Sequence, residues 1–175
     1  MGTKTISFSL DAKSISQAIR EVKTYRDEFA RNCKRLRELI GERIAWSASQ
    51  GFNSALVSDV IKGPSETNAN VQVSVENKDD VTVVFADGEQ AIFIEFGAGV
   101  YNNGAAGSSP HPWGAEKGFL IGEYGQGKGK RQAWGYYNDS GAVTVTRGTP
   151  AAMPMYHGLQ DTLRVMDDLV REVFG

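Results

Sequence analysis

The chain has 175 residues and a formal net charge of −2, which favours one ordinary globular domain and disfavours a dedicated nucleic-acid-binding protein. Hydrophobic residues make up 41% of the chain and charged residues 23%, as in typical globular proteins. No apolar run approaches the ~20 residues of a membrane-spanning helix, and Met1–Leu10 is too short and too polar for a signal peptide.

The first predicted elements are a strand and a short helix. Residues 5–10 alternate strictly between polar and apolar side chains, with Ile6, Phe8 and Leu10 on one face, which predicts a strand. Ser14 and Gln17 have the spacing of a capping box. The apolar stripe that follows consists of Ile15, Ala18, Ile19 and Val22.

A longer amphipathic helix is predicted next, to end near Gln50-Gly51. Its apolar stripe is formed by Phe29, Cys33, Leu36, Ile40 and Ile44. We expect Cys33, the single cysteine, to be buried in this stripe, and we interpret Gly41 as a point of close packing. Residues 1–62 carry 11 Lys and Arg against 7 Asp and Glu, interspersed along the helix, which indicates a solvated helix face.

A β-hairpin is predicted after this region. Val71, Val73 and Val75 alternate with polar residues, as do Val81, Val83 and Phe85, and residues 77–80 between them are turn formers. The run Ala91–Phe96 is apolar except for Glu95, and periodicity does not decide between strand and helix there.

The character of the chain changes over residues 97–141, of which 12 are glycine. Long stretches without regular structure are unusual in a compact domain and tend to be functional or disordered. This one is rich in aromatic residues, unlike true linkers. We therefore expect an insertion that docks on its own domain or on a neighbouring subunit. Its aromatic residues include Tyr101, Trp113, Tyr124, Trp134 and Tyr136.

The C-terminal part predicts a returning strand and a final helix. Residues 143–146 alternate as a strand does, and Gly148 to Pro150 form a turn. Apolar residues from Tyr156 to Val173 then recur at spacings of 3 and 4. The sequence as a whole predicts a single α+β domain over residues 1–175, in which N-terminal strand and helices precede a small antiparallel sheet and a C-terminal helix packs on it.

Two patterns resemble ligand sites, and we set both aside. Residues 122–128 have the glycine and lysine spacing of a P-loop, but Gly129 stands where that motif needs a hydroxyl for magnesium. Lys128, Lys130 and Arg131 near aromatic residues resemble a single-strand-binding surface, yet residues 97–141 have a net charge of only +1. We expect no cofactor and no sequence-specific nucleic-acid partner.

Two arrangements resemble catalytic sites, but neighbouring residues favour a structural role for both. Cys33 with His111 or His157 could act as nucleophile and base, but a thiol in an apolar stripe is unreactive. Glu95 could be a general base, although a glutamate in such a run is more often a strand residue facing water or an interface partner. With two histidines and one cysteine, a four-ligand zinc site of the usual composition is also excluded. We expect neither enzyme activity nor a metal.

A family resemblance rests on two stretches of the chain. The apolar run that ends in Glu95-Phe96-Gly97, and Pro150-Ala-Ala-Met-Pro154 before the last helix, resemble the tailed-bacteriophage family of minor tail component, neck and tail-completion proteins, lambdoid tail-completion proteins among them. The predicted hairpin and N-terminal helix occur in the same order, so the resemblance covers most of the chain. Ala98 stands where family members commonly have threonine.

The resemblance implies a structural protein of the virion that acts at the head–tail junction by self-association and by docking with other neck and tail proteins. We expect a homo-oligomer in the virion, no membrane contact and no catalysis. The alternatives are an interaction module outside any virion, such as a bacterial adaptor, or a tail-associated hydrolase. The expected interface residues are Ile6, Phe8, Glu95, Phe96, Gly97, Tyr101, Trp113, Tyr124, Trp134 and Tyr136.

Overall fold

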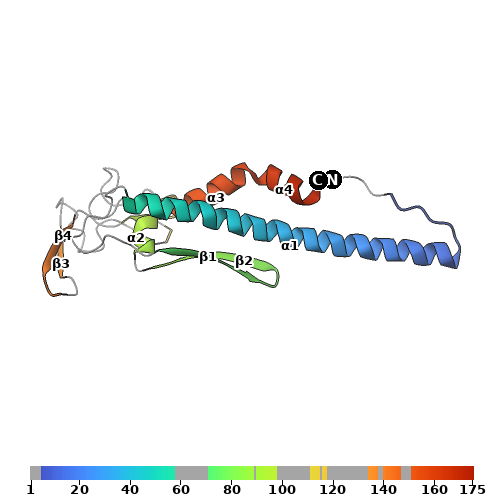
Figure 1. The fold of residues 1–175 in the computed structure, drawn as a ribbon, viewed down its shortest axis with the longest axis horizontal. Helices are drawn as coiled ribbons and strands as arrows, with labels where there is room; N and C mark the ends of the chain where they lie inside the picture. The colour runs from blue at the N-terminus through green and yellow to red at the C-terminus, as the bar shows by residue number, and fades with distance from the viewer. Residues whose placement is uncertain are drawn as a thin grey trace.

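The fold is organised around one very long helix. The computed structural model describes residues 5–57, 71–88, 90–97, 111–114, 116–117, 134–137, 140–146 and 151–175. Helix α1 (Ala12–Val57) packs against a hairpin of β1 (Gln72–Lys78) and β2 (Val81–Asp87) on one side. Helices α3 (Pro154–Arg164) and α4 (Met166–Phe174) pack against its other side, as Figure 1 shows. The α+β class predicted from the sequence is confirmed. The C-terminal helices, however, pack on α1, which lies between them and this hairpin, and not on the sheet as predicted.

Helix α1 begins with a dense set of polar contacts. The Oδ1 atom of Asp11 accepts hydrogen bonds from the backbone N–H groups of Lys13 and Ser14, at 3.1 and 2.9 Å. The hydroxyl of Ser14 accepts one in return from the N–H of Ser9, at 2.9 Å. The Ser9 hydroxyl and, after it, the Ser14 N–H lower the pKa of the exposed Asp11 carboxyl. Asp11 is thus the N-cap residue of α1, and Ser14 lies within the first helical turn. The sequence had predicted Ser14 itself as the N-cap residue.

Two predictions for the N-terminal region are wrong. The two helices predicted between Ser14 and Gln50 are one continuous helix of 46 residues, which extends to Val57. The segment 5–10 is not a strand. An alternating segment becomes a strand only where another backbone pairs with it, and no described strand does so here.

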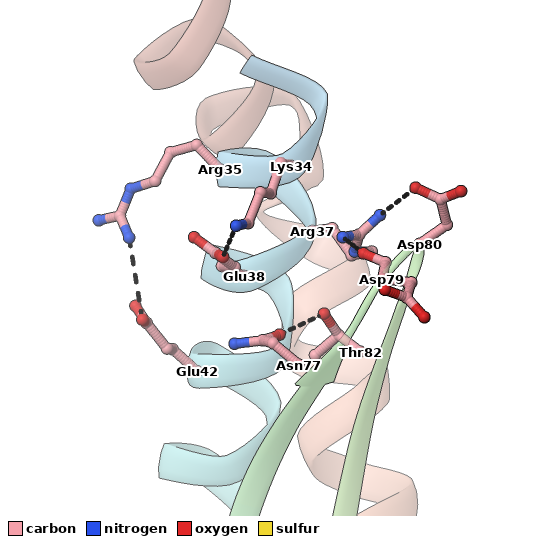
Figure 2. Close-up of polar contacts among 9 residues, drawn as sticks. All are labelled: Lys34, Arg35, Arg37, Glu38, Glu42, Asn77, Asp79, Asp80 and Thr82. Atoms are coloured by element: carbon pink, nitrogen blue, oxygen red, sulfur yellow. Dashed lines mark hydrogen bonds and ion pairs between the residues drawn. The ribbon is translucent and has the colours of Figure 1, made fainter. Parts of the chain in front are cut away.

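The β1–β2 hairpin confirms the predicted one and lies directly on α1. Its strands pair antiparallel from Gln72↔Asp87 to Lys78↔Val81. A Cβ atom added to Gly41 would lie 2.5 Å from Cγ2 of Thr82, so the predicted close packing at this glycine is confirmed. At the hairpin tip, Arg37 donates to the Asp79 carbonyl and lies 3.9 Å from the Asp80 carboxylate, as Figure 2 shows.

The hydrophobic core lies at the C-terminal end of α1. Phe52 and Ala55 of α1 pack there with Ala91 and Ile94 of α2 (Ala91–Phe96), the run whose type the sequence left open. Small residues let α3 approach α1 closely, because a Cβ atom on Gly158 would lie 2.9 Å from the backbone oxygen of Ile44. Within the described residues, this core cluster therefore lies toward one end of an elongated molecule (Figure 1).

The predicted C-terminal helix is broken in two at Val165, where the backbone leaves helical geometry (φ −107°, ψ 13°). The Thr162 hydroxyl donates to the Gly158 carbonyl at 2.8 Å, a side-chain bond that bends helices. The predicted returning strand is confirmed as β4 (Val143–Thr146), which pairs antiparallel with β3 (Trp134–Tyr137).

Candidate interaction surfaces

Glu95 joins α2 to the start of α3. Its Oε2 atom accepts a hydrogen bond from the backbone N–H of Met155 at 2.8 Å, and its Oε1 atom accepts one from Tyr156 at 2.9 Å. These N–H groups belong to the first turn of α3, where helix N–H groups lack helical partners and favour negative charge. The carboxylate thus caps a helix that begins about 60 residues later in the chain.

His111 completes the contacts of this carboxylate. Its Nε2 atom lies 3.0 Å from Oε1 of Glu95, and its Nδ1 atom accepts a hydrogen bond from the backbone N–H of Trp113 at 3.1 Å. Because Nδ1 accepts, the ring proton must lie on Nε2, which then donates to Glu95. Both side chains are buried, with residue exposures of 6% for Glu95 and 3% for His111.

Aromatic rings surround this pair. The His111 ring lies 4.4 Å from Phe96, 5.6 Å from Trp113 and 5.3 Å from Tyr156, measured between ring centroids. Trp113 and Tyr156 also meet edge to face at 5.4 Å. Residues 111–114 of the glycine-rich insertion are therefore packed against α2 and α3 of their own domain.

The expectation that Glu95 faces water or a partner is therefore wrong. Its position in an apolar run reflects burial on a helix, and its partners come from segments 16 and 60 residues away in the chain. The prediction that Cys33 is buried is also wrong, because this residue is exposed on α1. Among the described residues, no group of His, Cys, Asp and Glu could hold a metal ion.

The N-terminal half of α1 presents apolar side chains to solvent. Residues 12–35, called the arm below, include no buried residue, and Figure 1 shows most of this segment extending beyond the hairpin and α4. On one face, Ile19 is 50% and Val22 is 54% exposed. Phe29 meets Phe174 of α4 at 5.7 Å, where the covered part of α1 begins. The other exposed apolar residues of the arm are Ile15 and Tyr25.

A second exposed apolar face lies on the hairpin. The inward face of β2, with Thr82, packs on α1, whereas Val81, Val83 and Phe85 alternate with it and are 42–57% exposed. We call these three residues and their cross-strand neighbours the outer hairpin face. Ile92 and Phe93 of α2 are also large apolar residues with exposed side chains.

Charge is segregated between the arm and the rest of the chain. The arm has 7 Lys and Arg against 3 Asp and Glu, a net charge of +4, whereas residues 36–175 have 11 against 17, a net charge of −6. Residues 72–87 of the hairpin contribute one lysine and four acidic residues to that total, or −3. The arm and the rest of the chain therefore have net charges of opposite sign.

The structure separates the predicted interface residues into groups. Glu95, Phe96 and Trp113 are brought together in the His111 cluster, and Gly97 ends α2 with φ 79°. Ile6 and Phe8 lie together in the segment before α1, where Phe8 is exposed. Trp134 and Tyr136 occupy β3, opposite Thr146 and Thr144. Tyr101 and Tyr124 lie outside the described residues, as does the P-loop-like segment 122–128.

Comparisons with known proteins identify no relative of this chain. No protein-family model matches the sequence, and neither a curated protein nor a solved structure matches it. Within the described part of the chain, no helix combines the length and the apolar character that crossing a bilayer requires.

Proposed function

We propose that this protein is a structural component of a tailed-bacteriophage virion, located at the head–tail junction, where it associates with itself and docks with other neck and tail proteins. The observation that carries the proposal is the arm, a helix segment with a row of exposed large apolar side chains. Exposed apolar surface of this extent, bordered by charge, is typical of protein–protein contact sites.

The arrangement of the molecule suits a joining role. The core is gathered at one end of α1, and the hairpin, α3 and α4 brace the middle of the helix. These contacts fix the direction of the arm relative to the rest of the molecule. A neighbour that binds the arm is therefore held at a defined orientation to this chain. Two motif stretches support the family resemblance, Glu95-Phe96-Gly97 and the segment that leads to Pro154. They contact each other where α2 meets the start of α3.

The arrangement gives no comparable support to catalysis. Both oxygens of Glu95 accept backbone hydrogen bonds, and Oε1 also accepts the His111 proton. A carboxylate whose acceptor positions are used by the fold has little capacity left to take a proton from a substrate. Within the described residues, the pair acts as a structural connection between α2, α3 and the insertion.

Deletion of the gene from a phage that encodes it tests the proposal. We expect electron microscopy to show unjoined heads and unfinished or unattached tails, and expression of the wild-type chain from a plasmid to restore infectious particles. A complementing variant with Ile19 and Val22 both changed to Gln should fail, whereas the matched exposed changes Ser16→Gln and Thr24→Gln should succeed. Normal infectious virions from the deletion phage would refute the proposed function.

A further inference from the structure

We infer that the arm of one copy binds across the outer hairpin face of a second copy of this chain, in a head-to-tail contact. The inference rests on the proposed function for its setting and deepens it, because it names the surfaces through which the protein associates with itself. The inference can be refuted without refuting the proposed function, because it is tested on the purified protein and not in the virion.

The first support is the match between two unpartnered apolar faces on the same chain. From Ile15 to Tyr25 the unpartnered apolar row of the arm is about 15 Å long at 1.5 Å per residue. The apolar row of the outer hairpin face, from Val81 to Phe85, is roughly 14 Å long at ~3.4 Å per residue. The inner face of the same hairpin already carries a helix, α1, at Gly41. A second helix on the outer face would place the hairpin between two helices.

Charge and exposure distinguish this partner from two other surfaces of a second copy, its arm and its helix α4. Two arms with a net charge of +4 each would repel along their whole length. The exposed side of α4 is acidic, with Asp167, Asp168 and Glu172, but its large apolar residues turn toward α1 and are half-buried. The outer hairpin face combines exposed large apolar residues with a small negative charge, because Lys78 pairs with Glu76 there and Asp87 lies at the end of β2. The hairpin as a whole, with Asp79 and Asp80 at its tip, has a net charge of −3 over residues 72–87.

A contact between two different surfaces has a consequence for assembly. Each bound copy still presents one free arm or one free outer hairpin face, so association continues until the rotation closes a ring or an open filament forms. A contact between identical surfaces would stop at the dimer. The surfaces named here therefore predict species larger than a dimer as the protein concentration rises.

The experiment uses sedimentation velocity and light scattering on the purified full-length chain over a range of concentrations. We expect the wild-type chain to associate in dilute buffer and to dissociate at high salt, because the charges are exposed. The arm variant Ile19→Gln with Val22→Gln, and the hairpin variant Val81→Thr with Val83→Thr, should each weaken association at least tenfold. Ser16→Gln with Thr24→Gln should leave it unchanged, and circular dichroism should show wild-type helix content in all three.

Mixing the two defective variants separates the competing geometries. The arm variant keeps a native hairpin face and the hairpin variant keeps a native arm, so a head-to-tail contact predicts a 1:1 complex on mixing, although neither variant associates alone. An arm-to-arm contact predicts that the hairpin variant associates normally and that mixing restores nothing. That result would overturn the inference.

Two further outcomes would also overturn it. One is a wild-type chain that stays monomeric at every concentration and salt, and the other is a monomer whose arm binds anionic phospholipid vesicles instead. A monomer in solution, together with unjoined heads and tails in the deletion phage, would reject this contact and leave the proposed function standing. Normal virions from that phage, together with head-to-tail association in solution, would reject the function and leave the contact.

Discussion

Replacement of Glu95 by Gln is the most direct test of the junction between α2, α3 and the insertion. The native carboxylate accepts three hydrogen bonds, from His111 and Tyr156 at Oε1 and from Met155 at Oε2. A glutamine side chain has one acceptor oxygen and one NH2 donor. If the glutamine oxygen takes the place of Oε1, its NH2 group faces the N–H of Met155. In the reverse orientation the NH2 group faces two donors, His111 and the N–H of Tyr156.

The expected loss follows from this mismatch. One buried N–H group without a partner costs about 1–3 kcal/mol. Removal of the negative charge from the N-terminus of α3 adds about 0.3–1 kcal/mol. We therefore expect Glu95→Gln to lower the free energy of unfolding by about 1.3–4 kcal/mol. The same substitution at the exposed Glu116, which pairs only with its neighbour Lys117 among the described residues, should change it by less than about 0.5 kcal/mol.

Chemical denaturation measures the global effect, and native-state hydrogen exchange measures the local one. The backbone N–H groups of Met155 and Tyr156 should exchange at least about tenfold faster in Glu95→Gln, because each 1.4 kcal/mol of lost protection corresponds to a factor of ten. Unchanged exchange at both groups, together with a wild-type free energy of unfolding, would refute the assignment of Glu95 as the cap of α3.

Three further predictions test the packing and the start of α1. Gly158→Ala should lower the free energy of unfolding by about 1–3 kcal/mol, because the new Cβ would lie 2.9 Å from the backbone oxygen of Ile44. This clash outweighs the higher helix propensity of alanine. Chemical denaturation that shows a more stable variant would contradict this. Gly41→Ala should also destabilise the protein, and Thr82→Ser, which removes the methyl group 2.5 Å from the new Cβ, should recover part of the loss in a double-mutant cycle. Because the pKa of Asp11 is lowered from its ordinary 3.8 on folding, its stabilisation of the first turn of α1 is complete above that pH and is lost as the pH falls through the lowered pKa. Backbone chemical shifts of residues 12–16 should show this fraying in the wild type and not in Asp11→Asn.

Local patterns predicted the elements whose geometry is decided locally. The hairpin follows from alternation and turn chemistry, and in it Asp79 adopts φ 44°, a conformation that aspartate tolerates. The close approach at Gly41 follows from a glycine in the apolar stripe of a helix. The continuity of α1 could also have been found, because neither glycine nor proline interrupts the chain between Ser14 and Gly41.

The features that the sequence did not predict depend on partners distant in the chain. The helical state and burial of Glu95 depend on His111 and on the first turn of α3. Phe29, Cys33 and Ile19 have the spacing of core residues, yet only the later part of the same stripe is covered by α3 and α4. Periodicity identifies the apolar face of a helix but contains no information on whether that face has a partner within the same chain.

The length of α1 explains how such an uncovered face can persist as helix. An isolated helix must form a first turn against an unfavourable nucleation step, and short helices are therefore marginal in water. The arm needs no such step, because it extends a helix already fixed by Gly41 under the hairpin and by Ala48 under α3. Asp11 then caps its free end. A partner that binds the arm consequently meets a formed helix, and the contact need not supply the free energy of folding it.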